Sequence, residues 1–89
     1  MMILGIDTAT DVLNLAITDN ERIIADYKIQ KEGRTHSALI IPVLKDMLDI
    51  TRIALQDIDG IAVSIGPGSF TGLRIGLATA KGLVFSLSI

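Results

Sequence analysis

Hydrophobic and polar residues follow one period at the start of this chain and another further on. Residues 2–7 (MILGID) are a short apolar run ending in an acid, which is typical of a buried strand. Residues 12–19 (VLNLAITD) alternate with period two, and residues 22–30 (RIIADYKIQ) continue as a third strand. The polar residues 19–21 between them predict a tight turn. The first 30 residues therefore predict an antiparallel meander.

A helical period begins at residues 37–50 (SALIIPVLKDMLDI), where apolar residues recur at intervals of three and four. Thr35 or Ser37 can cap this helix at its N-terminus. Pro42 lies past the first turn, where a proline should bend the helix or remove a hydrogen bond. The segment therefore predicts an amphipathic helix with one apolar face.

Residues 61–66 (IAVSIG) are apolar at nearly every position and predict a fourth strand, buried on both faces. A second helix is predicted from Phe70. The resulting order, β-β-β-α-β-α, is the one with which ribonuclease-H-like α/β folds begin, among them the actin-like ATPase domains and several nucleases. We therefore expect residues 1–89 to form the N-terminal subdomain of such a fold.

Composition excludes several classes of protein. The chain has 89 residues, no cysteine and a net charge of −2, so it offers neither disulfides nor a basic surface that would grip nucleic acid alone. Its start has no basic region typical of a signal peptide. The apolar segment after Ile61 is interrupted by residues 66–68, Arg74 and Lys81, so we expect a buried segment and no membrane span. Because the last residues are apolar and uncapped, we expect the N-terminal part of a longer protein.

Glycine recurs within residues 63–83, and two interpretations compete. A glycine turn between a strand and a helix can bind anions. However, no Lys follows Gly72 as a Walker A loop requires, and Thr71 stands where a dinucleotide fingerprint needs its third glycine. Gly72, Gly76 and Ala80 instead recur every four residues along one ridge, which favours close packing. The residues that could still form a phosphate or anion loop are Asp7, Thr8, Thr10, Gly66, Gly68, Ser69, Thr71 and Gly72.

Asp7 ends the first strand and has three interpretations. It could hold a metal ion in a nuclease, lie beside a phosphate-binding hairpin in an ATPase, or accept a hydrogen bond within its own turn. Asp46 and Asp49 lie on the first helix, but the fourth strand ends without an acid, so the carboxylate set of a nuclease is incomplete. His36 is the only histidine, and we predict no metal site.

Three segments of the chain resemble the bacterial TsaB family, also called YeaZ. They are ILGIDTAT, RTHSALIIPVLKDML and DIDGIAVSIGPGSFTGLRIGLATAKGL, in the order and spacing of that family. The GPGSFTGLRIG run is very specific, and the resemblance covers essentially the whole chain but only the N-terminal half of the family's length.

The resemblance implies an actin-like (ASKHA) fold and a role in the threonylcarbamoyladenosine modification of tRNA. It implies a cytoplasmic scaffold that pairs with its catalytic paralogue TsaD, in a complex with the ATPase TsaE, and that forms a homodimer without TsaD. ATP and metal are expected on the partner subunits, and tRNA contact is expected to be indirect. The turn at residues 7–10 has no glycine after its acid, and the chain has no two-histidine motif, so we expect no catalysis. The family is also called a glycoprotease, but no nucleophile–base pair is evident here.

The family's partner surface is built from the two helices of this half. We therefore expect Gly76→Leu to abolish pairing and leave the fold largely intact. A metal-dependent nuclease and a nucleotide-binding ATPase module remain the alternative functions. The residues expected at the partner interface are Leu39, Ile40, Val43, Leu44, Met47, Gly72, Leu73, Gly76, Leu77 and Ala80.

Overall fold

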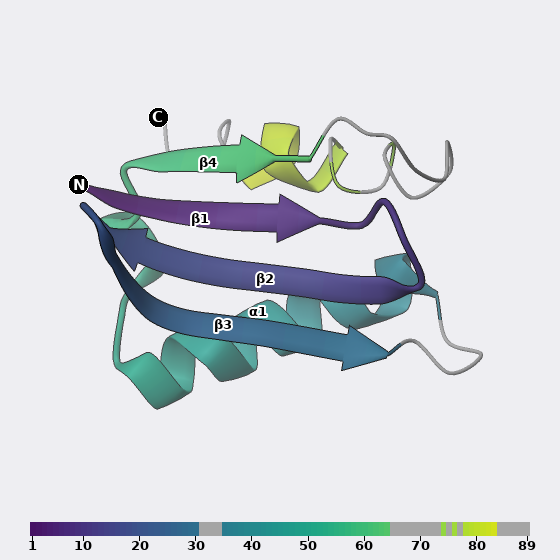
Figure 1. Cartoon of the computed structure of the whole chain (residues 1–89), viewed down its shortest axis with the longest axis horizontal. Coiled ribbons are helices and arrows are strands. Elements are labelled where there is room, and N and C mark those ends of the chain that lie inside the picture. Colours follow the sequence, from purple (N-terminus) through teal and green to yellow (C-terminus); the bar gives the residue numbers. More distant parts are fainter. Residues whose placement is uncertain (31–34, 65–73, 75, 77, 84–89) are drawn as a thin grey trace.

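The strands form one mixed sheet in the order β3-β2-β1-β4 (Figure 1). The computed structural model describes residues 1–30, 35–64, 74, 76 and 78–83. The predicted meander is confirmed, because β2 pairs antiparallel with both of its neighbours, and β4 pairs in parallel with β1. The bounds are β1 Met2–Asp7, β2 Val12–Asp19, β3 Arg22–Gln30 and β4 Gly60–Val63.

Strand β2 shows how the period-two pattern sets the buried face of the sheet. Its side chains Leu13, Leu15 and Ile17 are 0% exposed, whereas the residues between them remain partly exposed. Successive side chains of a strand point to opposite faces, so these three side chains all lie on the face that the helices cover. The apolar residues that alternate along β2 thus form one side of the core.

Helix α1 (His36–Thr51) extends one residue beyond the predicted segment at each end. Thr35, one of the two predicted candidates, is its N-cap, and the Thr35 Oγ1 atom accepts a hydrogen bond of 3.2 Å from the Ala38 backbone N–H. Pro42 lies inside the helix, where its ring nitrogen has no hydrogen to donate to the carbonyl four residues earlier. At the C-terminus, Arg52 adopts the left-handed conformation with φ 58°.

The core lies between the sheet and α1, which crosses behind the strands in Figure 1. This crossover is needed because β3 and β4 lie at opposite ends of the sheet and β4 runs parallel to β1. The 3-10 helix η1 (Leu55–Asp57) follows α1 and leads to β4. The buried apolar side chains of this cluster are Leu4, Ile6, Leu13, Leu15, Ile17, Leu39, Ile40, Leu44, Met47, Ile58 and Ala80.

The start of β4 is fixed to the start of β1 by two reciprocal hydrogen bonds. The Asp59 backbone N–H donates to the Met2 carbonyl at 2.8 Å, and the Met2 backbone N–H donates to Asp59 Oδ2 at 2.8 Å. These bonds set the register in which Ile3 lies beside Gly60.

The prediction for the fourth strand was partly wrong. The strand ends at Val63, and Ala62 is exposed, so it is not buried on both faces. Its place at the end of the strand order among the described residues accounts for this exposure. Residues 74, 76 and 78–83 are helical, in agreement with the predicted second helix. No helix within the described part of the chain is long and apolar enough to cross a membrane.

Candidate functional site

The apolar face of α1 packs into the chain's own core. Leu39, Ile40, Leu44 and Met47 are between 0% and 7% exposed and contact the sheet-side cluster. Val43 is partly buried against the same cluster. The burial of Leu39, Ile40, Leu44 and Met47 in the chain's own core argues against their assignment to a partner surface, and the assignment of the partly buried Val43 stays a prediction. A helix with one apolar stripe buries it against the nearest apolar surface, which here is the sheet.

The described part of the glycine ridge also faces the core. Gly76 is buried, and a Cβ atom placed on it would lie 2.6 Å from Thr8 Oγ1 and 3.5 Å from Val63 Cγ1. Ala80 is 6% exposed and belongs to the core cluster. The packing interpretation of this ridge is confirmed at Gly76, but the neighbour is the sheet and not a partner helix.

The expectation that Gly76→Leu would leave the fold largely intact is wrong for the same reason, because there is no room for a side chain beside Thr8. Three further predicted interface residues lie outside the described residues, so their assignment stays a prediction. They are Gly72, Leu73 and Leu77.

The turn after β1 uses the Asp7 carboxylate internally. Asp7 Oδ1 accepts a hydrogen bond of 2.9 Å from the Ala9 backbone N–H. Thr8 and Ala9 are 2% and 4% exposed, and Thr10 is exposed at the surface. A backbone N–H that is already bonded to a carboxylate is not free to bind a phosphate oxygen. The interpretation of Asp7 as a turn-stabilising residue is therefore confirmed.

The other half of the predicted anion loop cannot be placed against this turn. Its residues Gly66, Gly68, Ser69, Thr71 and Gly72 lie outside the described residues. The convergence of the two segments on one ligand stays a prediction. Within the part of the chain that the structure describes, no group of three or more acidic, histidine or cysteine side chains could hold a metal ion.

A polar network lies on β2 and β3. Asn14 Nδ2 donates to Asp26 Oδ1 at 2.8 Å and to the Tyr27 carbonyl at 3.0 Å, and Lys28 Nζ lies 2.7 Å from Asp26 Oδ2. The hydrogen bond from Lys28, followed by the one from Asn14, lowers the pKa of Asp26 below its ordinary value. Both side chains of the ion pair are exposed, so this pair is a surface contact of small energetic weight.

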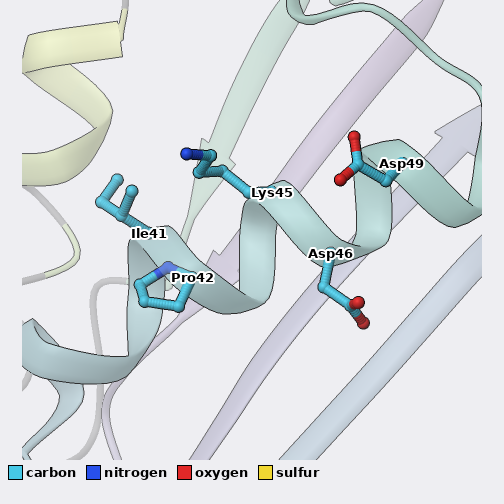
Figure 2. Close-up of a pocket in the computed structure, with 5 residues that line it drawn as sticks. All are labelled: Ile41, Pro42, Lys45, Asp46 and Asp49. Atoms are coloured by element: carbon cyan, nitrogen blue, oxygen red, sulfur yellow. The ribbon is translucent and has the colours of Figure 1, made fainter.

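The outer face of α1 carries the surface feature that the sequence patterns did not reveal. A shallow hollow is lined by Ile41, Pro42, Lys45, Asp46 and Asp49 (Figure 2). Ile41 and Lys45 project to one side of the helix, and Asp46 projects to the other (Figure 2). Ile41 is 45% exposed, which leaves apolar area accessible beside charged groups of both signs.

A signal for this surface was present in the sequence. Ile41 falls outside the apolar stripe of α1, although it is a large apolar residue. A large apolar residue outside the stripe of an amphipathic helix does not contribute to the core that the stripe covers.

A comparison with known families shows to which family this chain belongs. The sequence model of the TsaD family, described as tRNA N6-adenosine threonylcarbamoyltransferase, matches residues 22–89. The chain belongs to this family. The matched segment begins at β3 and includes α1 and β4.

Within the family, TsaB proteins match the whole chain, which confirms the predicted resemblance. The tRNA threonylcarbamoyladenosine biosynthesis protein TsaB of Bacillus subtilis is 40% identical over 89 residues, and that of Escherichia coli is 37% identical. Both alignments cover 100% of this chain and 38% of the relative. The chain therefore spans well under half the length of these TsaB proteins.

Solved structures confirm the fold class. YeaZ from Pseudomonas aeruginosa superposes with a TM-score of 0.86 at 31% identity, covering 98% of this chain and 40% of that one. A second crystal structure, of a protein described as similar to peptidase YeaZ from the same organism, gives a TM-score of 0.89 at 33% identity and covers 98% and 39%. The chain thus has the ribonuclease-H-like, actin-like fold that the order of its elements predicted.

Proposed function

We propose that this chain is a non-catalytic partner subunit in the threonylcarbamoyladenosine modification of tRNA and that it pairs with a TsaD-type catalytic subunit. The observation that carries this proposal is the match of TsaB proteins, named for that biosynthesis, across all 89 residues at up to 40% identity. The alternatives, a metal-dependent nuclease and an ATPase module, are not favoured by these relatives.

The turn after β1 supports a subunit without chemistry of its own. In this turn the Asp7 carboxylate is bonded to the Ala9 N–H of the same chain. Thr8 is 2% exposed, and its Oγ1 atom lies against Gly76. The Asp7 carboxylate and the Thr8 side chain thus both have internal roles in the turn and its packing. We propose that no cofactor binds this chain alone, with ATP and metal held by the partner subunits.

For the partner surface we propose the outer face of α1, around Ile41, Pro42 and Lys45, in place of the buried stripe. An exposed isoleucine beside a proline offers apolar area, and the neighbouring Lys45, Asp46 and Asp49 offer charges that can fix the orientation of a partner. Gly72, Leu73 and Leu77, which lie outside the described residues, stay in the proposed partner interface.

The proposed assembly is the one that the family resemblance implies. We propose that TsaE joins through the pair with TsaD, that a homodimer forms when TsaD is absent, and that tRNA contact is indirect. The proposed location is the cytoplasm. The TsaB relatives are more than twice as long as this chain, which aligns with 38% of the length of the Escherichia coli protein.

The function is tested by mixing the full-length protein with TsaD of the same organism. We expect binding by calorimetry, and we expect threonylcarbamoyl transfer to tRNA to require this protein. If the protein does not bind TsaD and transfer proceeds without it, the proposed function is wrong. Hydrolysis of ATP or cleavage of nucleic acid by the protein alone would instead favour the alternatives.

The surface is tested separately with Ile41→Glu. We expect the affinity for TsaD to fall about tenfold or more, because an apolar contact is replaced by a charge, and tenfold corresponds to about 1.4 kcal/mol. Ile23→Glu is the matched control, since Ile23 is a 70% exposed isoleucine on β3 that does not line the hollow. Wild-type affinity in Ile41→Glu would refute the surface while leaving the function intact.

A further inference from the structure

No further inference is drawn: the strongest candidate, the apolar outer edge of β4 (Gly60–Val63) at the end of the described strand order, carries nothing because no described residue shows what lies against it.

Discussion

The contact between Gly76 and Thr8 gives the sharpest test of the packing, and Gly76→Ala is the perturbation. Gly76 lies in a helical stretch without a positive φ, so in open space alanine would stabilise the helix by about 1 kcal/mol. Here the new Cβ atom would lie 2.6 Å from Thr8 Oγ1, a distance that real Cβ contacts do not reach. Thr8 is 2% exposed and so cannot turn outward to relieve the contact.

The magnitude follows from these two opposed effects. Overpacking a tight site destabilises a protein by about 1–3 kcal/mol, and the higher helix propensity of alanine offsets about 1 kcal/mol of this loss. We therefore expect Gly76→Ala to lower the free energy of unfolding by up to about 2 kcal/mol. For a domain of this size, each 1 kcal/mol corresponds to a shift of about 4–8 °C in the melting temperature.

Gly82→Ala is the matched control in the same helical stretch. A Cβ atom at Gly82 meets no atom within 4 Å, so only the helix preference acts. This variant should be more stable than the wild type, by at most about 1 kcal/mol. The two alanine variants should differ by about 1–3 kcal/mol, measured by urea denaturation of the purified protein.

The double variant Thr8→Ala/Gly76→Ala isolates the contact. Removing Thr8 Oγ1 should restore room for the new methyl group, so the double-mutant cycle should show a favourable coupling of about 0.5–3 kcal/mol. If Gly76→Ala stabilised the protein as much as Gly82→Ala, and the cycle showed no coupling, the close contact between Gly76 and Thr8 would be refuted.

Three further predictions concern caps and charge. Arg52→Gly should raise the melting temperature, because Arg52 holds a left-handed φ of 58° that costs about 1–2 kcal/mol for a residue with a side chain; an unchanged value would show that no strain is present. Thr35→Ala should cost about 1 kcal/mol of stability through loss of the N-cap, whereas Thr35→Ser should retain most of it, as read from urea denaturation. The carbon-detected NMR titration of Asp26 should give a pKa below its unfolded value of about 3.9, and Lys28→Met should raise this pKa. The contribution of the ionised Asp26 to stability is present above the unfolded pKa and is lost as the pH falls through the lower folded pKa. An unshifted titration of Asp26 would contradict the hydrogen bonds from Lys28 and Asn14.

Local patterns accounted for most of the elements. The three strands of the meander kept their predicted bounds, and Thr35 caps α1. These features depend on residues close together in the chain, such as the alternation in β2 and the hydroxyl three residues before the Ala38 N–H. The same is true of Asp7, whose carboxylate reaches an N–H two residues away.

The partner surface could not be predicted in this way. An apolar stripe indicates that a helix face is buried, but it does not say whether the covering surface belongs to the same chain or to another. We assigned Leu39 and Met47 to a partner, and the sheet covers both. The hollow around Ile41 was missed because a single off-stripe isoleucine is a weak signal until the rest of the helix is seen to be covered.

The sequence alone thus determined the three strands of the meander, the extent of α1 to within one residue at each end, and the close packing at Gly76. The tertiary structure decided which neighbour that is. Hydrophobic burial depends on area and not on direction, so the pattern predicts that a face is buried without identifying its neighbour. The register of β1 with β4 placed Val63 beside Ile6, and Thr8 and Val63 both lie against Gly76. The packing of α1 on the sheet left Ile41 on the outside.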